Sequence, residues 1–173
     1  MELYEAITTR RSVRSFRDGH VADATIEKLL RAAMLAPSAG NQQPWKFIVV
    51  RDRARLDGVP SFHPYCTMIT QVSVAIIVCG DHTGKMVPDL WPQDCSAAMK
   101  NLLLAARDGG LGAVWTGVYP LEDRMAGCRQ LFTIPNHVFP FAIVPIGYPR
   151  DPKAAFTQVD RYKPELVYRE SYK

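Results

Sequence analysis

The sequence has no closely spaced cysteine pair and no long apolar run, and each absence excludes a class of protein. Its cysteines form no Cys-x-x-Cys motif and lie far apart, at Cys66, Cys79, Cys95 and Cys128. This spacing disfavours a disulfide framework or a zinc site, so we expect structural thiols in a reducing compartment and a cytoplasmic protein. No apolar run approaches a membrane span. The acidic, amphipathic start, MELYE, does not match a secretory signal.

The common nucleotide-binding motifs are also absent. The chain has no Gly-x-Gly-x-x-Gly after an expected strand and no P-loop, which disfavours a Rossmann dinucleotide site and phosphoryl transfer. Its formal net charge is only +4, and no RNA-binding or zinc-finger signature occurs, so nucleic acid is not the expected partner. His63 and His82 have no partner at metal-ligand spacing, and we expect no metal site.

The composition is that of a globular protein with one domain. The chain has 173 residues, of which 47% are hydrophobic and 22% charged. A chain of this length is long enough to bury a sizeable core. Expected strands and helices alternate irregularly, which favours an α+β fold over a regular doubly wound fold.

Three arginines lie within five residues near the start, in the segment TRRSVRSF at residues 9–16. Valine and phenylalanine disfavour a helix here, so we expect an extended or turning segment. Guanidinium groups match phosphate oxygens and the hydrogen-bonding edge of a ring, which favours an anionic ligand that carries a ring. A solvated charged surface is the alternative. Alternation along an extended chain would set one group of side chains on each face: Arg10, Ser12 and Arg14 against Arg11, Val13 and Ser15.

A second unusual segment, APSAGNQQPW at residues 36–45, contains amide and hydroxyl side chains and no charge. Two prolines fix its backbone, and Gly40 allows a tight bend. Asn and Gln amides both donate and accept hydrogen bonds, which suits a flat heterocycle. An ordinary polar turn is the alternative.

The remaining pattern predicts the other elements. We expect helices over residues 2–9, 23–34, 94–106 and 121–131, and strands over 45–50, 72–79, 113–118 and 138–146. The 72–79 strand is apolar throughout and should be central. Pro140 and Pro145 favour a place near a sheet edge or a local irregularity for the last strand. Gly117 would let a ligand approach the backbone, or it makes a simple bulge.

Together these segments resemble the nitroreductase family of flavin mononucleotide (FMN) proteins. The resemblance rests on RRSVRSF at residues 10–16, PSAGNQQPW at 37–45 and GLGAVWTG at 110–117, which occur in the family's order and separation. It implies an α+β fold with a central, mainly antiparallel sheet flanked by helices, in a homodimer with FMN at the subunit interface. Residues 1–149 would form the FMN-binding domain, and residues 150–173 a tail that packs on the domain or the partner subunit.

The resemblance also implies a set of site residues. Arg10, Arg11 and Ser12 would hold the phosphate and ribityl chain, and Arg14 the N1 and O2 edge of the ring. Thr116 and Gly117 would present backbone N–H groups to N5, and Arg161 and Lys163 are candidates for further phosphate contacts. The amide-rich loop would contribute, in part from the partner, the residues Pro37, Ser38, Ala39, Asn41 and Gln43.

The implied activity is an NAD(P)H-dependent FMN oxidoreductase that reduces nitroaromatics, quinones or similar small acceptors by a ping-pong mechanism. The cofactor supplies the chemistry, so we expect no catalytic side chain. Two alternatives stay open. One is an FMN enzyme of another reaction type, such as reductive dehalogenation or flavin destruction, and the other is a non-catalytic flavin carrier or sensor. The short chain leaves little room for an inserted segment over the flavin, which leaves the choice of substrate open.

Overall fold

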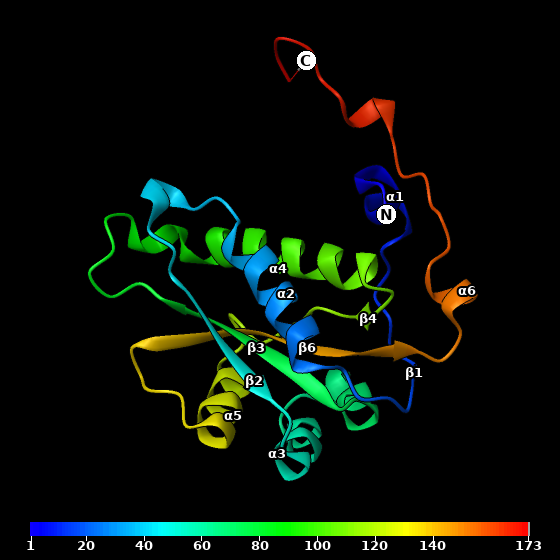
Figure 1. The fold of residues 1–173 in the computed structure, drawn as a ribbon. Helices are drawn as coiled ribbons and strands as arrows, with labels where there is room; N and C mark the ends of the chain where they lie inside the picture. Colours follow the sequence, from blue (N-terminus) through cyan, green and yellow to red (C-terminus); the bar gives the residue numbers. More distant parts are fainter. Residues whose placement is uncertain (173) are drawn as a thin grey trace.

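The fold is an antiparallel sheet with helices on both faces, seen in a computed structural model that describes residues 1–172 (Figure 1). The helices α2 (Asp23–Met34) and α4 (Trp91–Asp108) cover one face of the sheet, and α3 (Arg53–Gly58) and α5 (Glu122–Phe132) lie on the other. The helix α1 (Leu3–Thr9) lies beside the end of α4, at Asp108 and Arg107. The α+β architecture predicted from the sequence is therefore confirmed.

The sheet is organised around its longest strand, β6 (Val138–Pro149). One edge of β6 pairs with β3 (Val74–Asp81), which pairs in turn with β2 (Trp45–Val50). Three two-residue strands also pair with β6, one after another along its length: β5 (Thr116–Gly117), β4 (Gly112–Ala113) and β1 (Phe16–Arg17). The sheet order sets these three on the side of β6 away from β3. The arginine segment, residues 9–16, and the GLGAVWTG motif, residues 110–117, therefore meet along one side of β6.

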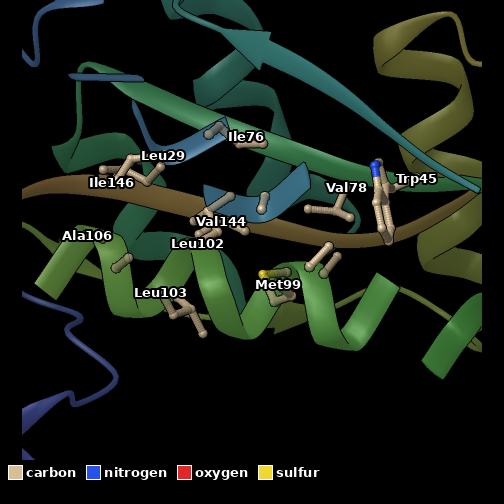
Figure 2. Packing of buried hydrophobic residues seen from close by; sticks show 14 of the residues in the cluster. Leu29, Trp45, Ile76, Val78, Met99, Leu102, Leu103, Ala106, Val144 and Ile146 are labelled. Carbon is tan, nitrogen blue, oxygen red and sulfur yellow. The ribbon is translucent and has the colours of Figure 1, made fainter. Parts of the chain in front are cut away.

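The core has two layers because β3 is buried on both faces. Val74, Ile76 and Val78 pack toward α2 and α4, whereas Ala75, Ile77 and Cys79 pack toward α3 and α5. Figure 2 shows Leu102 of α4 beside Val144 of the sheet, and Met99, Ala106 and Ile146 belong to the same buried cluster. The predicted central position of this strand is confirmed, although the strand begins and ends two residues later than expected.

The local irregularity predicted for the last strand is confirmed, and the strand lies next to one edge of the sheet, with only two-residue strands beyond it. β6 lies inside the sheet, and the register against β3 shifts between Val78 and Cys79, opposite Pro140. On the other side, the register that joins β4 and β5 to β6 would set Val114 opposite Pro145. Because proline has no N–H to donate, the ladder is interrupted there. The expected 113–118 strand is therefore two short strands.

The chain leaves the sheet through a short helix, α6 (Pro152–Ala155), whose N-cap Asp151 accepts hydrogen bonds from Lys153 N and Ala154 N. Phe156 lies under the guanidinium of Arg107, and Val159 N donates to Thr8 O. Beyond this point every described residue is exposed, and the tail runs past α1 away from the body of the molecule (Figure 1). Lys173, the last residue of the predicted tail, lies outside the described residues.

Among residues 1–172, no helix combines the length and apolarity that crossing a membrane requires. All four cysteines are buried with free thiols. Burial raises the pKa of Cys66 to about 11 and that of Cys79 to about 12, so both thiols are protonated at neutral pH. A protonated, buried thiol is a poor nucleophile, which fits the structural role expected of these cysteines.

Candidate functional site

The arginine segment begins where α1 ends. Arg107 of α4 donates from Nε to Thr9 Oγ1 at 2.8 Å, which fixes the end of α1 against α4. Arg11 folds back and donates to Thr8 O at 2.7 Å and to Arg10 O at 2.6 Å. These bonds satisfy carbonyl groups at the helix C-terminus, where a cation is also favoured by the helix dipole. Arg107 and Arg11 are thus held in place before any ligand binds.

Arg10 lines a cavity of about 300 Å³ together with Arg11, Arg161 and Lys100. Its Nε is buried and has no hydrogen-bond partner among residues 1–172. Burial lowers the pKa of Arg10, and the charges of Arg11 and Arg161 lower it further. Burial and Arg10 likewise lower the pKa of Lys100. Four cations and one carboxylate, Asp160, line this cavity. The excess of positive charge and the unsatisfied buried donor favour an anion such as phosphate.

Lys100 is a candidate site residue that the sequence analysis missed. It lies in the middle of α4, where a lysine is an ordinary exposed helix residue, and only the fold brings it to the arginines. Arg161 reaches the same cavity from the tail, whereas Lys163 lies exposed two residues further on and does not line it. The two tail cations predicted together are therefore separated in this chain.

A second cavity of about 320 Å³ lies on the other side of the same segment, between it and α6. Ser12, Arg14 and Arg150 line it, and Arg11 reaches both cavities. Five consecutive residues, 11–15, line this one cavity, so the cavity does not separate the two groups of side chains that a regular extended segment would set on opposite faces. The segment is not a regular strand: Ser12 makes a single bridge to Ala113, and Val13 N donates to Ala113 O.

The amide-rich loop is anchored at the other end of α4. Asp94, in the first turn of α4, accepts from Ala39 N and from Gln42 Nε2, each at 2.9 Å. Gln42 also exchanges hydrogen bonds with the backbone of Val87 in both directions. Gln42 and the backbone of Ala39 thus hold the loop, and this network explains how an uncharged segment can be stiff.

The middle of the loop also carries exposed residues. Gly40, Asn41 and Gln43 all have positive φ, at 55°, 53° and 47°, which is uncommon for residues other than glycine. Such strained backbone persists where its surroundings hold it, and it clusters at ligand sites. Asn41 and Gln43 are exposed, as is Pro37, whereas Ser38 and Ala39 are half-buried. The two exposed amides are available to a ligand or a second chain.

One chain does not bring the loop to the arginines. The loop is hydrogen-bonded to Asp94 and the arginine segment to Arg107, thirteen residues apart on the same helix. At 1.5 Å per residue, these anchor points are separated by about 20 Å. Figure 1 shows the loop and α1 near opposite ends of α4. The two halves of the candidate site therefore lie apart within the described residues of one chain.

Gly117 presents its backbone at the open edge of β5. Val118 N donates to Phe141 O at 3.0 Å, and successive residues of a strand direct their N–H and C=O groups to opposite edges. Thr116 therefore directs its N–H toward Ile143 of β6, and Gly117 directs its N–H outward. A Cβ added at Gly117 would meet nothing within 4 Å. Of the two residues predicted to face a ligand, Gly117 has the available N–H.

Four aromatic side chains contact one another in a row that begins and ends two positions from Gly117 in the sequence, at Trp115 and Tyr119, and we call them the aromatic frame. Trp115 contacts Phe141, which contacts Trp91, which contacts Tyr119, with ring centroids 5.3, 5.8 and 4.7 Å apart. Exposure alternates along this stretch, so that Trp115 and Tyr119 are exposed while Thr116 and Val118 are buried. The two exposed rings thus flank the open glycine on one face of the strand.

The residues present fit FMN, because each of its two chemical ends has a counterpart. The unsatisfied Arg10 Nε and its neighbouring cations suit a phosphate, and the free edge at Gly117 suits a ring nitrogen that accepts a hydrogen bond. Ala113, where the arginine segment attaches, is four residues from Gly117, or about 13 Å along an extended strand. An elongated ligand with an anion at one end and a flat ring at the other matches this arrangement.

Comparison with known proteins agrees with this geometry. The model of the nitroreductase family matches residues 7–77 and 88–148. A protein of Methanothermobacter thermautotrophicus named "Putative NADH dehydrogenase/NAD(P)H nitroreductase" is 49% identical over 99% of this chain and 88% of its own length. A crystal structure of a protein with the same name from Parabacteroides distasonis is 40% identical, covers 98% of both chains and has a TM-score of 0.92.

A third relative was solved with a ligand. The crystal structure of a "putative nitroreductase in complex with fmn" from Desulfovibrio desulfuricans is 29% identical and has a TM-score of 0.83 over 100% of this chain and 99% of that one. The family model covers most of this chain, and the first relative is nearly half identical over almost all of it. The chain belongs to the nitroreductase family.

Proposed function

We propose that this protein is an FMN-dependent oxidoreductase that takes reducing equivalents from NADH or NADPH and passes them to a small aromatic acceptor. The observation that carries the proposal is the pairing of a cationic cavity at Arg10 with a free backbone edge at Gly117, along one side of the sheet. FMN, when bound, supplies the hydride chemistry, first as acceptor and then as donor. The relatives' names, NAD(P)H nitroreductase and an FMN complex, support the same function.

The chain's own residues bind and orient the cofactor in this proposal. Arg10, Arg11 and Lys100 hold the phosphate, and Arg161 closes the cavity from the tail. Arg14, which makes only a 3.4 Å contact to Ser12 O, is free to approach the N1 and O2 edge of the ring. A fixed cation there stabilises the negative charge that reduction places on the ring. Ser12 lies between these groups and contacts the ribityl chain.

The amide-rich loop would come from a second copy of the chain. In one copy it is about 20 Å along α4 from the arginines, yet Asn41 and Gln43 are exposed and held in a strained backbone. A homodimer that brings one copy's loop to the other copy's arginines would complete the site at the interface. We therefore propose that Pro37, Ser38, Ala39, Asn41 and Gln43 contribute across that interface, and that Lys163 does so from the tail.

The exposed apolar residues support such an interface. Leu3, Tyr4 and Leu35 are largely exposed on α1 and just after α2, next to a surface cavity of about 370 Å³ that α1, α2 and α4 line. In the tail, Tyr162 and Leu166 are also largely exposed. Apolar surface of this extent marks an interaction site in most proteins. We propose that residues 1–149 form the FMN-binding domain and that residues 150–173 pack on the partner subunit.

The aromatic frame supports a planar acceptor. Trp115 and Tyr119 stand on either side of Gly117, where a flat ring would contact aromatic faces and edges. Nitroaromatics and quinones have this shape, whereas an aliphatic acceptor would gain little from it. The test replaces Trp115 with leucine, for which we expect a higher KM for a naphthoquinone and an unchanged rate of FMN reduction by NAD(P)H.

The decisive experiment is to purify the protein, record its visible spectrum and identify the released chromophore. We expect FMN, bleached by excess NADH or NADPH and reoxidised by added quinone. A colourless protein that does not bind added FMN would contradict the cofactor. FMN that stays oxidised under both nucleotides would instead favour a carrier or sensor, and turnover with a halogenated aromatic but not with quinone would favour dehalogenation.

A further inference from the structure

Arg124 lies at the same strand edge as Gly117, although neither motif nor pattern in the sequence distinguishes it. It belongs to the first turn of α5, on the face of the sheet opposite α4. Its Nη1 donates to Gly117 O at 2.8 Å. The guanidinium also lies over the ring of Tyr65, 5.4 Å from the centroid. The side chain is thus fixed between an aromatic face and the backbone of the residue proposed to face the flavin.

This bond matters because Gly117 must be held by its backbone alone. Glycine has no side chain to pack, and its φ and ψ are the least restricted of any residue. The N–H of Val118, which follows it, donates to Phe141 O, and the Gly117 carbonyl points to the outer edge. The Gly117 carbonyl and the Val118 N–H belong to one peptide, and the bonds to Arg124 and Phe141 orient that peptide. The preceding peptide, which carries the Gly117 N–H, is oriented by the pairing of Thr116 with Ile143. Arg124 therefore restricts ψ of Gly117, and with both peptides oriented the N–H of Gly117 has a defined direction before a ligand binds.

His63 completes the surroundings of this bond. It is buried, at 1% exposure, and neither ring nitrogen has a hydrogen-bond partner among residues 1–172. Burial lowers the pKa of His63 and the charge of Arg124 lowers it further, against a smaller opposite effect of the Gly117 backbone, so the ring is neutral at neutral pH. A neutral ring excludes water without repelling the guanidinium. The Arg124 charge is thus partly desolvated, which strengthens its bond to the carbonyl.

We infer that Arg124 is a positioning residue for hydride transfer, which acts by fixing the Gly117 peptide against the N5 edge of the flavin. The inference rests on the proposed function, because it needs FMN at this edge. A cation beside the N5 edge would also stabilise the reduced cofactor, as Arg14 does at the opposite edge. Losing a charged hydrogen bond and the alignment it sets costs about tenfold or more in rate.

The experiment compares three variants of the FMN-loaded protein: Arg124→Gln, Arg124→Lys and the matched control Arg129→Gln. Arg129 lies on the same helix, donates to the carbonyls of Pro135 and Val138, and lies over Phe139 at 5.4 Å, but it does not touch Gly117. We expect Arg124→Gln to slow single-turnover reduction of FMN by NAD(P)H about tenfold or more and to make the midpoint potential of bound FMN more negative. Arg124→Lys should restore part of both, and Arg129→Gln should change neither.

A readout without cofactor tests the same bond. In the apoprotein we expect Arg124→Gln to speed hydrogen exchange at Val118, whose N–H is bonded to Phe141 O in the same peptide as the Gly117 carbonyl, and Arg129→Gln to leave it unchanged. An Arg124→Gln protein with wild-type potential and reduction rate would overturn the inference, as would a loss of rate that only follows a loss of stability and occurs equally in Arg129→Gln. If the wild-type protein itself binds no FMN or is not reduced, the proposed function fails before the inference is tested.

Discussion

Among single residues, Arg10 combines burial, positive charge and an unsatisfied donor. We predict that Arg10→Gln weakens FMN binding by about 10- to 100-fold, the effect of losing a charged hydrogen bond to phosphate. The unfolding temperature of the apoprotein should stay the same or rise, because the substitution removes repulsion from Arg11 and Arg161. Titrating FMN into apoprotein and following its fluorescence measures the first effect. Equal FMN affinity of the wild-type and Arg10→Gln proteins would mean that the phosphate binds away from Arg10.

His63 predicts how stability depends on pH. Its folded pKa lies below the ordinary value of 6.5, so below that pH the unfolded chain binds a proton that the folded chain resists. The contribution of His63 to the free energy of unfolding should therefore be constant above about pH 6.5. It should fall as the pH drops through the lowered pKa. Urea unfolding at several pH values measures the slope. Replacing His63 with glutamine should flatten this slope. Replacing His82, whose ring packs on Phe139, with glutamine should not.

The sequence predicted single site residues unevenly. The motif residues Arg10, Ser12 and Gly117 could be selected because they lie close together in the chain or in a recognisable pattern. Lys100 and Arg124 could not, since each is an isolated cation on a helix and only the fold brings it to the site. For the same reason, His63 resembled an ordinary loop residue until its burial was known.

At the level of elements, the open edge of β5 makes a testable distinction between two glycines. Gly117→Ala should leave folding intact, because its Cβ meets nothing within 4 Å, but the methyl group would occupy the approach to the backbone and weaken FMN binding. Gly112→Ala in the neighbouring β4 places a Cβ 2.7 Å from Val13 and should destabilise the fold itself. Thermal unfolding and FMN titration of both variants separate the two effects. Unchanged FMN affinity in Gly117→Ala would remove this edge from the site.

The elements that the sequence predicted well have strong apolar periodicity, such as α2, α4 and β2. α3 was missed because charged residues dominate its short sequence, although Asp52 before it does accept from Arg55 N as an N-cap. Pro140 and Pro145 predicted an irregular strand or one near an edge, but they could not show that β6 pairs along both of its sides. Its neighbours tolerate both prolines through a register shift on one side and a broken ladder on the other, and neither accommodation is visible in one strand's sequence.

For the whole molecule, we predict a dimer that depends on the tail. Light scattering after size exclusion should give twice the chain mass for the full chain. A chain truncated after Phe156 should show a weakened dimer, because every described residue beyond Val159 stays exposed on its own chain and is free to pack on a partner. A full-length monomer that retains FMN would contradict the shared site. Truncation that leaves the dimer intact would instead restrict the interface to α1, α2 and α4.

Because the two anchors lie far apart on α4, the amount of bound flavin should depend on the protein concentration. If the two anchors at Asp94 and Arg107 serve different flavins, a solitary chain offers each flavin only half of its contacts. Dilution that separates the subunits would then release the yellow chromophore, and added FMN would drive reassociation by mass action. A newly made chain would keep its flavin only after it has met a second chain.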